Sequence, residues 1–142
     1  MKRIALLVVG VFVISFLGCG GGGGDGNSII AKYVGTWQGL VNGYSFEWRL
    51  ILGDGGVDLD GNPQYSYEVW DLEDEATLGH GFLWGRGYAL AFPTGLVDFT
   101  AHHPTSGALT FRFTGYINGN KMTGEMWSFL NSSSSQFNFS KK

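Results

Sequence analysis

The side chains of this chain that could do chemistry are one cysteine, three histidines and two acidic segments. Cys19 is the only cysteine, so a disulfide within the chain is excluded. A metal cluster at this thiol is not expected, because no histidine lies near it. The thiol stands between an apolar run and a tract of glycines, in the segment FLGCGGGGGDG of residues 16–26. This position favours an anchor point on the chain.

The histidines and the longer acidic segment do not assemble a catalytic centre. Neither Gly-x-Ser-x-Gly nor His-Glu-x-x-His occurs in the sequence. His102 and His103 would point to opposite faces of a strand and could not chelate one ion together. We interpret these two and His80 as surface or local hydrogen-bonding groups, and residues 71–75 as a solvated acidic loop. The sequence therefore predicts a protein that is not an enzyme and needs no cofactor.

The second acidic segment resembles the opening of a calcium-binding loop. Asp58, Asp60 and Asn62 have the correct spacing for the first three ligands. However, Pro63 stands where such a loop needs glycine, and Val69 stands where it needs the bidentate glutamate. We predict a plain hairpin loop at this position, and no metal site.

The N-terminal residues have the pattern of a secretory signal peptide. Lys2 and Arg3 precede an apolar run at 4–17, which is too short to hold a mature protein across a bilayer. The sequence Leu17-Gly18-Cys19 resembles the lipobox of bacterial lipoproteins. That resemblance implies cleavage after residue 18 and acylation of Cys19 by chains such as palmitate, which would anchor the protein to a membrane. The alternative is an ordinary cleaved signal with an unrelated cysteine.

Three segments follow from this interpretation: a lipoprotein signal peptide at 1–18, a lipidated Cys19 with a glycine-rich tether at 19–27, and one domain at 28–142. By resemblance to the sorting rule of enteric bacteria, Gly20 favours delivery to the outer membrane. Removal of the signal peptide leaves seven basic residues against twelve acidic ones, a net charge of about −5. Such a domain is a poor candidate for nucleic-acid binding, which depends on phosphate neutralisation.

Alternation of apolar and polar residues dominates the predicted domain, as in Tyr44-Ser45-Phe46-Glu47-Trp48-Arg49-Leu50. Only residues 28–32 suggest a helical turn. Turn residues separate the alternating runs, for example in the segments 53–56 and 85–87. We expect eight or nine strands, near residues 34–42, 44–52, 64–72, 78–84, 87–92, 96–102, 108–117, 121–129 and 136–140. The sequence therefore predicts an all-β fold, an up-and-down antiparallel meander closed into a barrel of about eight strands.

Two segments share a pattern of glycine, aromatic, aliphatic, any residue and glycine, followed by a strand. They begin at Gly81 and Gly115, and we interpret each as the start of a hairpin. Glycine within a strand often marks a bulge or a bend at a barrel corner. Gly81, Gly115 and Gly124 therefore suggest a coiled sheet, and closure would remove its exposed edges.

The motif Gly35-Thr36-Trp37 resembles the Gly-x-Trp opening of calycins, the barrel superfamily that includes lipocalins and avidins. Segments 114–124 and 137–141 resemble the last strands of small lipocalin-like bacterial lipoproteins, so the likeness covers residues 34–141. It implies that Trp37 packs at the closed end of the barrel under a basic side chain from a late strand, for which Arg112 is the candidate. The biotin-contacting residues of avidin do not map onto this chain.

The aromatic residues leave two functions open. An eight-stranded barrel can be filled by its side chains or can hold one small ligand. In the first case the core consists of Phe46, Trp48, Leu50, Phe99, Phe111, Phe113, Met122 and Phe139. In the second, a small apolar molecule binds against candidate wall residues Phe46, Trp48, Tyr67, Phe111 and Phe113.

We therefore predict a membrane-anchored, lipocalin-like lipoprotein of the bacterial cell envelope that binds a small apolar molecule. The alternative is a filled barrel that docks another envelope protein through loops such as 71–80 and 131–135. Exposed tryptophans among Trp70, Trp84 and Trp127 would favour docking. A hollow interior would favour ligand binding.

Overall fold

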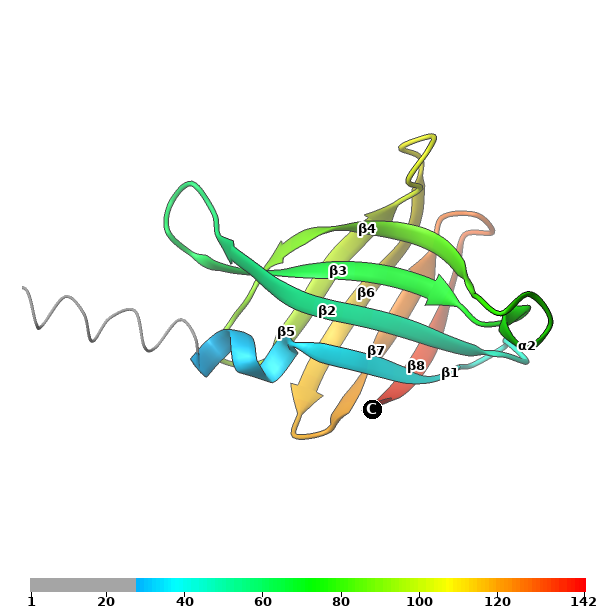
Figure 1. The fold of residues 1–142 in the computed structure, drawn as a ribbon, viewed down its shortest axis with the longest axis horizontal. Coiled ribbons are helices and arrows are strands. Elements are labelled where there is room, and N and C mark those ends of the chain that lie inside the picture. The colour runs from blue at the N-terminus through cyan, green and yellow to red at the C-terminus, as the bar shows by residue number, and fades with distance from the viewer. Residues whose placement is uncertain (1–27) are drawn as a thin grey trace, which may run out of the picture.

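The computed structural model describes residues 28–142 (Figure 1). The predicted signal peptide, Cys19 and the glycine-rich tether lie outside these residues. The described part is an antiparallel meander of eight strands, which confirms the predicted all-β barrel. The strands are β1 Gly35–Val41, β2 Glu47–Val57, β3 Pro63–Asp71, β4 Phe82–Leu90, β5 Leu96–His102, β6 Leu109–Asn118, β7 Lys121–Ser128 and β8 Ser133–Lys141.

Two helical segments accompany the sheet. Residues 28–33 are helical, as the sequence predicted for 28–32, and the short helix α2, Glu75–Leu78, lies in the connection from β3 to β4. The two segments lie at opposite ends of the barrel (Figure 1). Within residues 28–142, neither helix has the length and hydrophobicity that crossing a bilayer would require.

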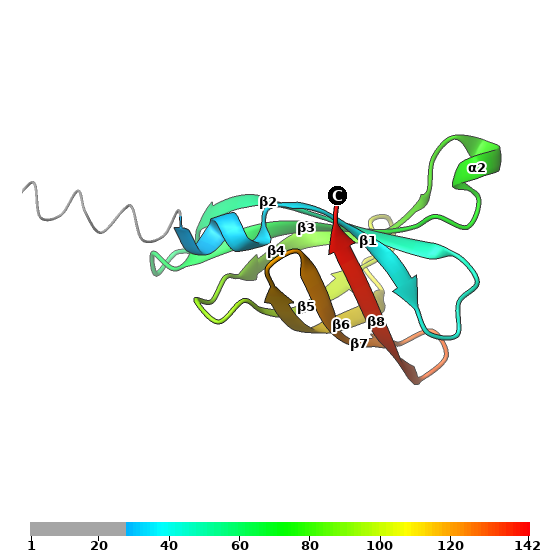
Figure 2. The same ribbon diagram turned by 90° about the horizontal axis from the view of Figure 1, so that it is seen from below.

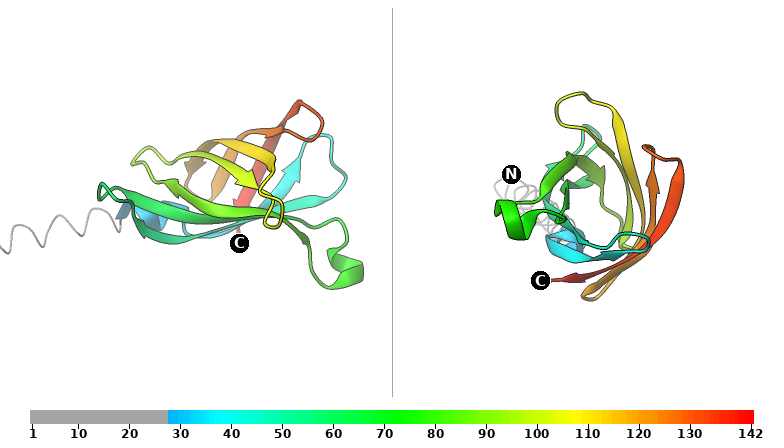
Figure 3. Two further views of the ribbon diagram at one scale, coloured as in Figure 1. Left: turned by 90° about the horizontal axis from the view of Figure 1, so that it is seen from above. Right: turned by 90° about the vertical axis from the view of Figure 1, so that its right-hand side faces the viewer.

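The strand order is β4-β3-β2-β1-β8-β7-β6-β5, so the first and last strands pair in the middle of the sheet. The β1–β8 ladder runs from Trp37 opposite Lys141 to Val41 opposite Phe137, and the two strands lie side by side in Figure 2. An end-on view shows the sheet curling around a central axis (Figure 3, right). The barrel is nearly closed, since the edge strands β4 and β5 contact each other. Closure is incomplete because no backbone ladder joins these two strands at the seam between them.

The segment 78–92 differs from the prediction. The expected strands at 78–84 and 87–92 are one strand, β4, and the expected turn at 85–87 lies inside it, so the first of the two similar hairpins does not exist. Gly85 and Gly87, which bound the expected turn, instead let neighbouring side chains approach the backbone of β4 closely. A Cβ at Gly85 would lie 2.7 Å from the Cβ of Ala101, and one at Gly87 would lie 2.6 Å from the Tyr67 hydroxyl. The second pattern does form a hairpin, between β6 and β7.

The expected turn at 53–56 is also wrong, because these residues continue β2 as far as Val57. The pairing of β2 with β3 shifts register between Asp54 and Val57, and the Asp54 carboxylate accepts a hydrogen bond from the Gly56 amide at 2.8 Å. The glycines here serve an irregular strand end, not a turn. The hairpin loop follows at residues 58–62, where the Asp58 carboxylate accepts bonds from the amides of Asp60 and Asn62.

The core occupies the inside of the barrel, as alternation predicted. Seven of the eight residues expected to fill it are buried, and Phe46 is half-buried against them. A row of rings crosses the interior from β3 to β8: Tyr67 stacks on Phe99, Phe99 on Phe113, and Phe113 contacts Phe137 and Phe139. Side chains therefore fill this part of the barrel.

Trp37 and the helical residues 28–33 close the end of the barrel away from α2. The Trp37 indole donates to the Tyr33 carbonyl at 2.8 Å. The basic side chain over its ring is Lys141, whose Nζ lies 5.4 Å from the ring centroid, and not Arg112. Arg112 alternates to the outer face of β6, where it pairs with Asp98 at 3.0 Å. Lys141 takes this place because β8, the true neighbour of β1, carries it opposite Trp37.

Candidate functional site at the α2 end

The five candidate wall residues fall into two groups. Phe46, Trp48 and Phe111 gather at the end of the barrel that carries α2, with ring centroids 5.9 Å apart for Phe46–Trp48 and 5.0 Å apart for Trp48–Phe111. Tyr67 and Phe113 lie deeper, and each stacks on Phe99. The sheet thus brings Phe46, Trp48 and Phe111 together at the α2 end of the barrel. It separates them from the row of stacked rings that contains Tyr67 and Phe113.

The strand register explains this grouping. Trp48 of β2 stands directly opposite Asp71 of β3, and Phe111 of β6 stands directly opposite Ser128 of β7. All four side chains are buried. Directly opposite residues on one face of an antiparallel pair have Cβ atoms roughly 5 Å apart. We call this group, together with Tyr44, Phe46 and Trp84, the α2-end cluster.

Two polar groups in the α2-end cluster have no hydrogen-bond partner. They are the indole Nε1 of Trp48, a residue that is 1% exposed, and the hydroxyl of Ser128, a residue that is 2% exposed. Buried polar groups in folded proteins are nearly always paired, and leaving one unpaired costs about 1–3 kcal/mol. Two such groups in one cluster indicate a place where a polar partner from outside the chain would be favourable.

Asp71 adds a charged acceptor to the cluster. The residue is 8% exposed, and its carboxylate accepts hydrogen bonds from the Trp84 indole at 2.7 Å and from the Glu73 amide at 3.3 Å. The interpretation of residues 71–75 as a solvated loop is therefore wrong for Asp71. The signal was present in the sequence: Tyr65, Tyr67 and Val69 alternate inward along β3, and the same period continues to Asp71.

Ser128 was also missed, for the same reason. Met122 and Met126 point inward along β7, and the next inward position is Ser128. A polar residue at an apolar position of an alternating pattern is the signal that would have found both side chains.

Tyr44 and Phe46 cover the cluster from the connection between β1 and β2. Both are half-buried, and the Tyr44 ring meets the Trp48 ring edge-on at 5.3 Å. Burial raises the pKa of Tyr44, and the nearby Ser128 hydroxyl partly offsets that rise. The two hydroxyls nevertheless do not form a hydrogen bond of normal length and angle. Tyr44 and Phe46 are therefore, with Trp84, the half-buried members of the cluster.

The histidines make the local hydrogen bonds predicted for them. His80 contacts the Gly81 carbonyl at 3.0 Å, His102 contacts the Gly107 carbonyl at 3.2 Å, and His103 accepts from the amide of Ser106 at 3.2 Å. Among residues 28–142, no three histidine, aspartate or glutamate side chains gather as metal ligands. At Asp58, hydrogen bonds from Asn62 and Asp60 lower the pKa of the carboxyl group.

The α2-end cluster combines apolar and polar groups. It contains aromatic rings, the unpartnered Trp48 indole and Ser128 hydroxyl, and the Asp71 carboxylate, a mixture typical of small-molecule sites. Comparison of the chain with protein-family models, curated proteins and solved structures finds no match.

Proposed function

We propose that this chain is a lipid-anchored protein of the bacterial cell envelope that binds a small, mainly apolar molecule at the α2 end of its barrel. The observation that supports this function most strongly is the pair of buried, unpartnered groups, Trp48 Nε1 and Ser128 Oγ, inside an aromatic cluster. A ligand with one polar group on an apolar body would satisfy both. The barrel fold and the Trp37–Lys141 contact support the lipocalin-like part of the proposal.

The polar group of the ligand must contain a hydrogen-bond acceptor, because an indole N–H can only donate. A carbonyl or hydroxyl oxygen between Trp48 and Ser128 meets this requirement. The apolar body would lie against Phe46, Trp48 and Phe111. Because both unpartnered atoms are sealed from solvent, Tyr44 and Phe46 must swing outward to admit the ligand.

The lipoprotein part of the proposal rests on the Leu17-Gly18-Cys19 motif and the apolar run before it. The acyl chains on Cys19 would hold the protein in a membrane, and Gly20 favours the outer membrane. Because residues 28–33 and α2 lie at opposite ends of the barrel (Figure 1), the ligand site would face away from the point of attachment. Such an orientation would turn the α2 end of the barrel toward molecules in solution.

Replacement of the lipidated residue is expected to release the protein. Cys19→Ser removes the thiol that the acyl chains require, so the variant should leave the detergent phase on phase separation and lose its incorporation of labelled palmitate. Gly22→Ser, a change in the tether, should behave as the parent does. A Cys19→Ser protein that still partitions with membranes would contradict the lipoprotein proposal.

Ser128→Ala is expected to leave the ligand-free domain as stable as the parent or to stabilise it by about 1 kcal/mol, because it removes an unsatisfied buried hydroxyl. It should also weaken binding of a carbonyl-bearing naphthalene dye, 6-propionyl-2-dimethylaminonaphthalene, by about tenfold. Denaturant midpoints and dye titrations measure both effects on residues 28–142, once circular dichroism has shown that this segment is folded.

Thr110→Val is the matched control for this experiment. The Thr110 hydroxyl is equally buried but donates to the carbonyls of Ala101 and Trp84, so its loss should destabilise the domain and leave dye binding unchanged. Absence of saturable dye binding by the parent would contradict the ligand proposal. Destabilisation by Ser128→Ala equal to that of Thr110→Val would also contradict it, because it would give Ser128 a structural role.

The docking function has one observation in its favour. Trp127 is exposed on the outer face of β7, next to Arg112 on β6, whereas Trp70 and Trp84 are half-buried. Trp127 lines a shallow groove of about 360 Å³, together with Arg112, Thr114, Glu125 and Phe129. A filled barrel that recognises another envelope protein through this groove is therefore the second candidate function. Dye binding at the α2 end decides between the two.

A further inference from the structure

The end of the barrel opposite α2 is the end at which the described chain begins. The helical residues 28–33 lie there and lead directly into β1 (Figure 1). Because the sheet is an antiparallel meander, β2, β4, β6 and β8 end on this side, and β3, β5 and β7 begin on it. We call it the anchored end. Nine residue steps separate Cys19 from Ser28, and a fully extended chain of this length spans at most about 30 Å.

The hairpin between β2 and β3 projects from the anchored end and carries exposed apolar side chains (Figures 1 and 2). Val57 is 65% exposed, and Leu59 is the most exposed large hydrophobic residue within 28–142. The two side chains line the same shallow hollow, so they belong to one surface. Single exposed apolar residues are common, but a pair that shares a surface at a hairpin tip favours a contact with a partner.

The hairpin tip is held in shape by its own hydrogen bonds. The Asp58 carboxylate accepts from the amides of Asp60 and Asn62 and from the Asn62 side chain. The Asp58 amide in turn donates to the Asn62 carbonyl at 2.9 Å. A tip that is already ordered can make a contact without a further loss of conformational entropy.

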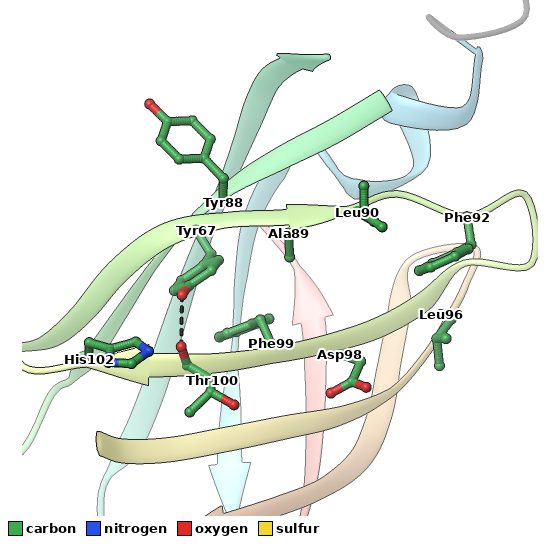
Figure 4. Close-up of a pocket in the computed structure, with 10 residues that line it drawn as sticks. All are labelled: Tyr67, Tyr88, Ala89, Leu90, Phe92, Leu96, Asp98, Phe99, Thr100 and His102. Carbon is green, nitrogen blue, oxygen red and sulfur yellow. Dashed lines mark hydrogen bonds between the residues drawn. The ribbon is translucent and has the colours of Figure 1, made fainter. Parts of the chain in front are cut away.

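A second loop adds apolar surface at the anchored end. Figure 4 shows Leu90 and Phe92 where β4 turns toward β5, and both side chains are exposed. The connection that follows, residues 91–95, is fixed to the helical segment, because the Lys32 ammonium donates to the Pro93 carbonyl. The helical segment, this connection and the hairpin therefore present apolar groups on the side where the tether joins the domain.

The lysines of the described chain are also gathered at the anchored end. Four lysines occur within residues 28–142, one in the helical segment, one at the start of β7 and two at the end of β8: Lys32, Lys121, Lys141 and Lys142. The aspartates near them belong to the hairpin and its β2 arm, at positions 54, 58 and 60.

The α2 end has the opposite charge. Glu47, Asp71 and the acidic residues at 73–75 lie there, and no lysine of residues 28–142 does. An anionic surface attracts lysines and repels carboxylates, so it would draw the anchored end toward itself and push the α2 end away.

A lipid bilayer is the partner that the tether would bring to this surface. Acyl chains on Cys19 would keep the domain beside the membrane, and a linked contact forms at a high effective concentration. Weak contacts from a few apolar side chains and lysines are then sufficient. Lysine side chains suit this position, because their stems can lie along apolar surface while the ammonium groups reach the headgroups.

We infer that the anchored end is a lipid-contact surface, an inference that rests on the acylation proposed for Cys19. Val57 and Leu59 enter the bilayer interface, and the lysines meet anionic headgroups. The contact holds the barrel in one orientation on the membrane, with the α2 end pointing away from it. Without the contact, the tether alone would leave the orientation free.

The test places the acylated protein in nanodiscs of phosphatidylcholine and phosphatidylglycerol that also contain a gadolinium-chelating lipid. Gadolinium at the level of the headgroups broadens the NMR signals of nearby methyl groups. We expect loss of the Val57 and Leu59 signals and retention of the Leu78 signal, because Leu78 is 60% exposed but lies in α2. Discs without phosphatidylglycerol should restore part of the lost intensity, because the lysines then have no anionic partner.

The double variant Val57→Ser with Leu59→Ser should stay in the discs through its acyl chains but recover the methyl signal of Leu90, which is broadened in the parent. Leu78→Ser is the matched control and should leave the Leu90 signal broadened. Both changes are at exposed positions, so neither should unfold the domain.

The outcomes separate the contact from the anchor. Retained Val57 and Leu59 signals in a protein that co-elutes with the discs would overturn the inference and leave the anchor in place. Protein that does not co-elute would contradict the acylation and the inference together. Equal Leu90 signals in the double variant and in Leu78→Ser would overturn the role of the hairpin, and equal broadening without phosphatidylglycerol would overturn that of the lysines.

Discussion

Replacement of Phe113 by alanine lowers the free energy of unfolding by about 3–5 kcal/mol, the cost of removing a packed phenylalanine. Phe113 has no exposed surface, and its ring contacts those of Phe99, Phe137 and Phe139 at centroid distances of 5.3–6.5 Å. These neighbours come from β5 and β8, so the cavity would lie between strands from both sides of β6 and β7. Urea denaturation followed by circular dichroism measures the change.

Phe111→Ala is the informative comparison. Phe111 belongs to the α2-end cluster, where we propose that neighbouring side chains open for a ligand, so its replacement should cost clearly less than that of Phe113. Tyr116→Ala in the same strand controls for the loss of an exposed ring and should change stability little. Equal, full costs at Phe111 and Phe113 would indicate that the interior is packed alike throughout, which favours the docking function.

Gly39→Ala is expected to destabilise the barrel by about 3 kcal/mol or more, because it inserts a side chain where strands β1 and β8 pair in the middle of the sheet. The new Cβ would overlap the Asn138 carbonyl, which is backbone and cannot swing away as a side chain can. Gly39 stands opposite Phe139 in the β1–β8 ladder and opposite Trp48 in the β1–β2 ladder. Separation of the strands at this point therefore affects both neighbours of β1.

Thermal denaturation and hydrogen exchange of β1 and β8 amides measure this effect. The amides of both strands should exchange faster in Gly39→Ala than in the parent, while those of β5 and β6 change less. Leu40→Ala, at the next and exposed position of β1, is the matched control and should leave exchange unchanged. Parent-like exchange in Gly39→Ala would show that the ladder tolerates the methyl group.

The sequence was most informative where one physical signal acted alone. Alternation over 47–50 and 111–114 identified strands and their inward faces, because one face of each strand is buried. It was wrong at the start of β6, where Thr110 is buried and Leu109 is exposed. Prediction failed where a glycine could indicate either a turn or a close contact within a strand. Gly85 and Gly87 resemble turn residues, yet they serve contacts with Ala101 and Tyr67, which no local pattern reveals.

The site was predictable only in part. Phe46, Trp48 and Phe111 could be proposed as wall residues from their inward positions, but their grouping at one end depends on strand register. Asp71 carried a readable signal that was overlooked, whereas the choice of Lys141 over Arg112 depends on which strand neighbours β1. The open seam between β4 and β5 could not be predicted, since these two strands follow one another in the chain and yet do not pair.

The pairing of β1 with β8 also determines the order in which the barrel can fold. Strands β1 to β4 and strands β5 to β8 each form a run of neighbouring hairpins, whose contacts are local and can form early. The β1–β8 ladder joins segments far apart in the chain, so its loop-closure entropy must be overcome last. Until then β1 and β8 each present a free edge to other molecules. Refolding is thus a competition between closure and association, and dilution favours closure.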